Sequence, residues 1–128
     1  MKYIIDSYAW IEYLEGSKIG EKVKEIVEDQ NNEIITNILN ISELSNYFER
    51  KGIDFDDSYK VILSLSKIFK FDSRFSKEVG TQCAQIRRKI SSFGLIDAYV
   101  LMTARQVNGK ILTGDRHFKD FNEAIILK

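Results

Sequence analysis

The sequence lacks several of the features that mark specialised classes of protein. Its 128 residues include no proline, one cysteine (Cys83) and one histidine (His117). A single cysteine excludes an internal disulfide, and one cysteine with one histidine cannot build a zinc cluster. A reducing, intracellular setting is the simplest interpretation. With this length and 44% hydrophobic residues, we expect one domain over residues 1–128 that buries a real core without metal or disulfides.

Net charge and long apolar runs are also absent. The 19 basic and 19 acidic residues balance, so binding to nucleic acid would depend on local patches. The clearest patch is Arg87, Arg88 and Lys89, which forms either a phosphate-binding cluster or a solvated helix face. The N-terminal apolar run meets Asp6 within a few residues and provides neither a signal-peptide core nor a membrane span. We therefore expect a cytoplasmic protein.

Strands and helices are predicted to alternate along the chain. Short apolar runs ending at acids or turn signals predict strands at residues 3–5, 33–36, 69–71, 110–113 and 124–128. Apolar residues at helical spacing predict helices ending at Gly16 and then over residues 17–29, 37–52, 56–69, 73–91 and 95–109, with Asn37 as a cap. The strands lack the alternation of a half-exposed sheet. This pattern indicates an α/β protein, a three-layer α/β/α sandwich with a central parallel sheet.

Four acids are expected at one edge of this sheet, because ligand sites in doubly wound sheets form at the carboxyl ends of the strands. Asp6 directly follows the first strand, and Asp115 follows the strand at 110–113. Glu43 lies early in the helix after residues 33–36. Asp97 lies in the first turn of the helix that returns to the strand at 110–113. All four carboxylates should therefore meet.

Each acid also has a structural interpretation. Asp6 and Asp115 can be helix caps or turn formers, and Glu43 can be a solvated helix residue. Asp97 is harder to explain in this way, because it belongs to LIDAYVLMTA, an apolar segment that we expect to form a buried helix. A buried carboxylate without a partner costs roughly several kcal/mol. Something must therefore compensate the charge of Asp97.

Clustered carboxylates favour a bound cation, which prevents the rise in their pKa values. Oxygen ligands favour Mg²⁺ or Mn²⁺ over zinc. Such a site can bind a phosphate oxygen and lower the pKa of a water molecule aligned with a phosphodiester. The four acids therefore indicate metal-dependent phosphodiester hydrolysis.

Four segments also match the motifs of a known family over essentially the whole chain. They are IIDSYAWIEYL, NISELSNYF, GLIDAYVLMTAR and ILTGDRHFKDF. In this order and spacing the chain resembles PIN-domain ribonucleases, most closely the VapC-type toxins of prokaryotic toxin–antitoxin systems. The resemblance implies a three-layer domain with a central parallel sheet, an RNA substrate, a homodimer and a VapB-type antitoxin that covers the active site.

The resemblance also implies roles for individual residues. It implies that four acids bind Mg²⁺ or Mn²⁺ and activate water. These acids are Asp6, Glu43, Asp97 and Asp115. Thr113 matches a hydroxyl position that supports the acids, and Ser7 does so beside Asp6. Tyr8 departs from the family pattern, in which many relatives carry Asn or Ser. We interpret Trp10 and Phe118 as core residues and His117 as structural, outside the site.

Two other functions remain open. A phospho-acceptor receiver domain also gathers acids and Mg²⁺ at a sheet edge, but it would need a second acid where Ser7 stands and a lysine where Gly114 stands. A non-catalytic PIN-type module that binds RNA or a protein partner would retain all four acids. The RNA target is not encoded by any motif in the sequence.

Overall fold

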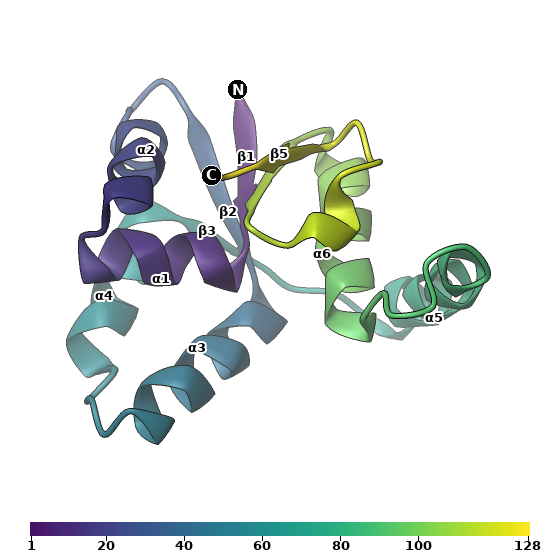
Figure 1. The fold of residues 1–128 in the computed structure, drawn as a ribbon, viewed down its shortest axis with the longest axis horizontal. Coiled ribbons are helices and arrows are strands. Elements are labelled where there is room, and N and C mark those ends of the chain that lie inside the picture. Colours follow the sequence, from purple (N-terminus) through teal and green to yellow (C-terminus); the bar gives the residue numbers. More distant parts are fainter.

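A five-stranded parallel sheet lies between two layers of helices (Figure 1). The structure is a computed structural model that describes residues 1–128. The strands are β1 (Lys2–Ile5), β2 (Glu33–Asn37), β3 (Lys67–Phe69), β4 (Lys110–Thr113) and β5 (Ala124–Ile126). The helices are α1 (Ser7–Glu15), α2 (Lys18–Val27), α3 (Ile38–Arg50), α4 (Asp56–Leu65), α5 (Ser73–Arg87), α6 (Leu95–Val107) and the short 3₁₀ helix η1 (Arg116–Phe118). The predicted three-layer sandwich is confirmed.

Consecutive residues of the central strands face opposite helical layers. Ile4 packs with α5 and α6, whereas Ile5 packs with the layer formed by α1 to α4. The same division separates Ile35 from Ile34 and Ile111 from Leu112. Both faces of the sheet are buried, which explains why the strands appear in the sequence as uninterrupted apolar runs. Core positions are also confirmed for Trp10, Cys83 and Phe118.

The strand order is β3-β2-β1-β4-β5, and all neighbouring strands are parallel. The chain builds β2 and β3 on one side of β1 and then crosses to the other side for β4 and β5. Ligands of doubly wound sheets bind at such a reversal, outside the carboxyl ends of the strands. Receiver domains have the order 2-1-3-4-5. The receiver alternative is therefore wrong on topology alone.

Left-handed residues end the helices where the sequence predicts an end. Gly16 has φ 68° after α1, Gly52 has φ 71° beyond α3, and Asn108 has φ 58° after α6. Asn37 is the predicted N-cap of α3. Its Oδ1 accepts a hydrogen bond from the Leu39 N–H at 2.8 Å, and its Nδ2 donates to the Thr103 hydroxyl at 2.9 Å. The second bond fixes the start of α3 against α6.

The region between α4 and β3 differs from the prediction. The helix ends at Leu65 instead of residue 69, and the strand occupies residues 67–69 instead of 69–71. Ser66 ends the helix in an extended conformation, and its hydroxyl lies 2.9 Å from the hydroxyl of Thr36 in β2. Pairing with β2 over three residues stabilises the extended form of a segment that has helical periodicity.

Other element ends also differ from the prediction, most of them by one or two residues. The predicted helix 73–91 ends at Arg87, and the chain then forms turns, in which the Arg87 Nε donates to the carbonyl of Phe93 at 2.6 Å. The last strand covers residues 124–126 instead of 124–128. None of the helices combines the length and the apolar character that crossing a bilayer requires.

Candidate active site

All four predicted acids converge at the carboxyl edge of the sheet, between β1 and β4. Asp6 follows β1 and is the N-cap of α1, and Asp115 follows β4 and is the N-cap of η1. Glu43 extends from the second turn of α3 and Asp97 from the first turn of α6. Their charges influence one another, since Asp97 and Glu43 both act to raise the pKa of Asp6. The four acids therefore lie together at the sheet edge where the predicted order of strands and helices places them.

Asp6 is the most buried of the four acids, with 7% of its surface exposed. Its Oδ1 accepts from the Ser7 N–H at 2.8 Å, and its Oδ2 accepts from the Thr113 hydroxyl at 2.8 Å. Burial raises the pKa of Asp6 to about 7, although the bonds from Thr113 and Ser7 act in the opposite direction. A group in this state is half protonated near neutral pH unless positive charge is placed beside it.

Asn40 joins Asp6 to Glu43 and was not predicted as part of the site. It is fully buried, and its Nδ2 lies 2.7 Å from Glu43 Oε1, 3.1 Å from Ser7 Oγ and 3.5 Å from Asp6 Oδ1. The Ser7 hydroxyl donates to Glu43 Oε1 at 2.7 Å. Asn40 lies three residues before Glu43 and hence on the same face of α3, which is the signal that sequence analysis missed. Together with Thr113, these residues form what we call the Asp6 network.

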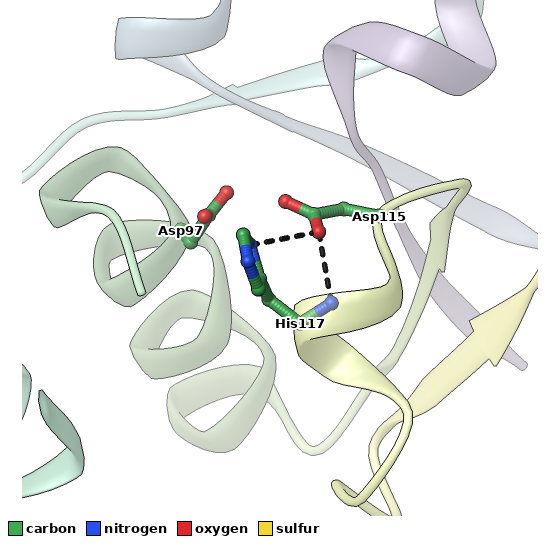
Figure 2. Close-up of side chains that lie close together, drawn as sticks. All are labelled: Asp97, Asp115 and His117. Atoms are coloured by element: carbon green, nitrogen blue, oxygen red, sulfur yellow. Dashed lines mark hydrogen bonds and ion pairs between the residues drawn. The ribbon is translucent and has the colours of Figure 1, made fainter. Parts of the chain in front are cut away.

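The other acids form a separate cluster with His117. One potential ligand atom from each of Asp97, Asp115 and His117 lies within 4.8 Å of the other two. Figure 2 shows the carboxylates of Asp97 and Asp115 pointing toward each other, with the imidazole ring beside both. Asp115 Oδ1 accepts from the His117 N–H at 2.8 Å and lies 3.0 Å from His117 Nδ1. We call these three residues the Asp97 group.

The expectation that Asp97 lies in a fully buried helix and lacks a capping role is wrong. Asp97 is only half buried, and Leu95 in the same turn is 50% exposed. The Asp97 carboxylate accepts from the Gly94 N–H at 3.3 Å and so caps the start of α6. Only one side of α6 packs on the sheet, and Asp97 lies at the rim of that contact. Partial burial, followed by the charge of Asp115, still raises the pKa of Asp97 to about 6.

The sequence interprets His117 as structural and outside the site, whereas the structure places its side chain beside Asp97 and Asp115. The 3₁₀ turn after Asp115 brings the imidazole back beside the Asp115 carboxylate. A histidine two residues beyond a candidate ligand is the sequence signal that could have found it, because such a turn places both side chains at one end of β4.

Thr113 connects the two halves of the site. Its hydroxyl donates to Asp6 Oδ2 at 2.8 Å and accepts from the Asp115 N–H at 3.0 Å. Both hydroxyls expected near the acids are therefore in contact with them, Thr113 with Asp6 and Ser7 with Glu43.

A match to a protein-family model identifies the family of this chain. The model of the PIN domain matches residues 3–124. The chain belongs to the PIN-domain family. A search of curated protein sequences gave no significant match.

Solved structures share the fold of this PIN domain. VapBC2 from Rickettsia felis, bound to a DNA fragment from its promoter, matches with a TM-score of 0.74 and 16% identity over 98% of this chain and 97% of that chain. A toxin–antitoxin complex from Klebsiella pneumoniae matches with a TM-score of 0.70 and 15% identity over 96% and 95% of the two chains. VapC20 of Mycobacterium tuberculosis, a toxin that cleaves the sarcin–ricin loop, has a TM-score of 0.75 and 11% identity over 98% and 99%. At these identities the likeness is one of fold.

The residues of this PIN domain fit a divalent cation. No lysine or arginine forms an ion pair with Asp6, Glu43, Asp97 or Asp115. Burial, together with smaller contributions from the neighbouring acids, raises the pKa values of Asp6 and Asp97, and a cation beside them would favour their ionised forms. Two buried polar atoms, Asn40 Oδ1 and His117 Nδ1, also have no hydrogen-bond partner. A cation would compensate the charge and match the predominantly oxygen donor set.

The predicted basic patch lies outside this cluster. Arg87, Arg88 and Lys89 are all exposed at the end of α5. Arg87 holds the turn before Gly94 through its bond to the Phe93 carbonyl. Lys89 borders a surface pocket with Arg105 and Asp120, and none of the four predicted acids lines this pocket.

Proposed function

We propose that this PIN domain is a Mg²⁺- or Mn²⁺-dependent endoribonuclease, which hydrolyses RNA phosphodiester bonds and leaves a 5′-phosphate and a 3′-hydroxyl. The observation that carries the proposal is the convergence of four carboxylates, without a lysine or arginine partner, at the strand reversal of a PIN fold. Carboxylates without a lysine or arginine partner repel an RNA backbone, so phosphate can approach only together with a cation.

In this proposal the four acids, Asp6, Glu43, Asp97 and Asp115, hold the cation and position water. Ser7, Asn40 and Thr113 keep the carboxylates of Asp6 and Glu43 in place through the bonds described above. A bound divalent cation supplies Lewis-acid chemistry, which neutralises charge on the phosphate and makes water more acidic. We further propose that Arg87, Arg88 and Lys89 contact the RNA backbone, as exposed basic side chains do in nucleic-acid complexes.

We also propose that the chain is the VapC-type toxin of a type II toxin–antitoxin module, forms a homodimer and binds a VapB-type antitoxin. The toxin–antitoxin systems among the structures of the same fold support this assignment. An exposed apolar surface supports a protein partner. Helix α2 buries Val23 and Val27 in the core, whereas α4 leaves Tyr59, Val61 and Leu63 exposed. Light scattering of the purified chain, alone and after coexpression with its neighbouring gene, tests both partners.

The activity is tested by incubating RNA with the wild-type chain and with Asp97→Asn, in the presence of Mg²⁺ or Mn²⁺. We expect cleavage by the wild type, loss of cleavage in the variant and loss on addition of EDTA. Asp120→Asn is a matched control, because Asp120 is an exposed acid two residues after η1 and does not belong to the cluster. Equal cleavage by wild type and Asp97→Asn would reject the assignment.

The non-catalytic alternative predicts a different result. A PIN module that only binds RNA or a protein partner would show no cleavage under any of these conditions. Isothermal titration with Mn²⁺ separates the two functions further, because failure to bind the ion at millimolar concentration would favour the non-catalytic module.

A further inference from the structure

We propose that His117 is a metal ligand of this site through Nδ1, and that this nitrogen makes the site prefer Mn²⁺ over Mg²⁺. The inference rests on the proposed function, because it concerns the same cation. It adds a nitrogen donor to a set that the sequence predicts to contain only oxygen.

The first observation is the position of Nδ1. It lies 3.0 Å from Asp115 Oδ1, and His117 belongs to the same group of potential ligands as Asp97. Adjacent ligands of an octahedral ion, each about 2.1 Å from it, lie roughly 3.0 Å apart. The separation of Nδ1 from Oδ1 is therefore the one that two neighbouring ligands of a single ion require.

The second observation is that Nδ1 has no hydrogen-bond partner. The atom is buried although the side chain as a whole is 40% exposed. Its approach to Asp115 lacks the alignment of a hydrogen bond, so the short distance does not arise from an N–H directed at the carboxylate. A buried nitrogen without a partner is costly unless a proton or a cation satisfies it.

The third observation concerns the other ring nitrogen. His117 Nε2 lies 2.9 Å from the hydroxyl of Ser92, in the turn before α6. When Nε2 carries the proton and donates to Ser92, Nδ1 keeps a lone pair that is free to bind a cation. Metal-bound histidines usually donate their second N–H to such a partner, which fixes the ring and its tautomer. Ser92 is therefore a positioning residue for His117.

The nitrogen donor also changes which ion the site prefers. Mg²⁺ is a hard cation that takes oxygen ligands and gives up its water reluctantly. Mn²⁺ belongs to the divalent first-row metals, which bind sites that combine nitrogen and oxygen ligands. A site with Asp97, Asp115 and His117 hence favours Mn²⁺, whereas the Asp6 network alone would suit either ion.

The test is pulsed electron paramagnetic resonance of Mn²⁺ bound to the untagged chain. His117 is the only histidine, so a protein labelled with ¹⁵N at histidine alone differs from the unlabelled protein only at this residue. We expect an imidazole nitrogen coupling to Mn²⁺ that changes from ¹⁴N to ¹⁵N on labelling. This measurement needs no variant and no RNA, and it does not depend on activity.

A competition titration gives the second readout. In His117→Asn we expect Mn²⁺ affinity to fall by at least about tenfold, with a smaller loss for Mg²⁺, so that the preference for Mn²⁺ declines. Asp120→Asn should retain both affinities.

The outcomes separate the inference from the proposed function. Bound Mn²⁺ without a histidine coupling would overturn the role of His117, and the imidazole would then be an ion-pair partner of Asp115 only. Absence of Mn²⁺ binding would overturn both that role and the proposed cation requirement.

Discussion

The Asp6 network and the Asp97 group lie at the same edge of the sheet but are held in different ways. In the Asp6 network, both carboxylate oxygens of Asp6 accept hydrogen bonds from Ser7 and Thr113, and Glu43 accepts from Ser7 and Asn40. In the Asp97 group, the Asp97 carboxylate has one long bond from a backbone N–H, and Nδ1 of His117 has none. The chain itself therefore fixes one half of the site, whereas the other half holds the Asp97 carboxylate only weakly and leaves Nδ1 of His117 available to a cation.

The largest expected effect comes from removing a carboxylate from either half. Asp6→Asn and Asp115→Asn should each reduce RNA cleavage by at least about a hundredfold, because each removes a charge from the cation site. Single-turnover cleavage with saturating enzyme measures the loss. If Asp115→Asn lost activity and Asp6→Asn retained it, Asp6 would be a cap of α1 only, and the Asp6 network would have a structural role alone.

Removing the charge of Asp6 should also change the stability of the fold. Whereas it lowers cleavage, it should raise the free energy of unfolding at neutral and higher pH. The pKa of Asp6 is raised from 3.8 to about 7 on folding, so the folded chain binds the proton more tightly than the unfolded chain. Its contribution is therefore greatest below about pH 4 and is lost as the pH rises toward 7. Asp97, with a pKa of about 6, contributes with the same sign over a narrower range.

Without divalent cations, Asp6→Asn should hence be more stable than the wild type at pH 8, by roughly 2 to 4 kcal/mol. The difference should disappear below about pH 3, where Asp6 is protonated in the folded chain and, with its ordinary pKa of 3.8, also in the unfolded chain. Urea unfolding at both pH values in EDTA measures it. Saturating Mn²⁺ should stabilise the wild type more than the variant. A variant less stable than the wild type at pH 8 would show that Asp6 is already compensated by the chain.

The Thr113 hydroxyl, which connects the two halves of the site, can be removed by a substitution that keeps the size of the side chain. Thr113→Val keeps the shape of the side chain but leaves Asp6 Oδ2 and the Asp115 N–H without their partner. We expect a loss of about 2 kcal/mol in the free energy of unfolding, together with a further rise in the pKa of Asp6. Thr113→Ser retains the hydroxyl and is the control. Equal stability of the valine and serine variants would mean that the two halves are held independently of Thr113.

The smallest expected effect concerns the two arginines of the basic patch, which should differ in their contribution to stability but not in RNA binding. Arg87→Ala removes the bond to the Phe93 carbonyl in the turn before α6 and should cost about 1 kcal/mol. Arg88→Ala, at the neighbouring exposed position, should change stability by less than about 0.5 kcal/mol. If the proposed backbone contacts form, both variants should bind RNA less tightly, and their RNA affinity should fall less steeply as the salt concentration rises. Thermal unfolding and RNA titration at two salt concentrations measure the two effects, and unchanged RNA affinity in both variants would reject those contacts.

The order of elements and the places of the acids could be predicted because they depend on local patterns. Apolar runs such as YII and KILT are buried on both faces. Asp6 follows the first run directly, and Asp115 follows the second after Gly114. Parallel strands bring their carboxyl ends to one edge, so proximity of the acids follows from topology. Trp10 and Phe118 were assigned to the core on the same basis, since a large aromatic side chain in an apolar segment is usually buried.

The errors arose where a distant contact competed with a local pattern. Residues 66–69 have the periodicity of a helix, but pairing with β2 extends them. Asp97 lies in an apolar segment, yet its side chain emerges at the rim where α6 meets the sheet. His117 and Asn40 are ordinary residues in the sequence, and only the packing of η1 and α3 against the acids brings them into the site.

The sequence by itself determined the class of fold, the edge at which the acids meet and the oxygen-rich character of the site. These follow from hydrophobic periodicity and from the positions of acids relative to strand ends, both of which are local properties. Only the tertiary structure decided that Asp6 is the buried carboxylate, that Asn40 and Thr113 hold the network, and that His117 joins Asp97 and Asp115. The physical reason is that burial and hydrogen bonding depend on elements far apart in the chain, whose separations no local pattern specifies.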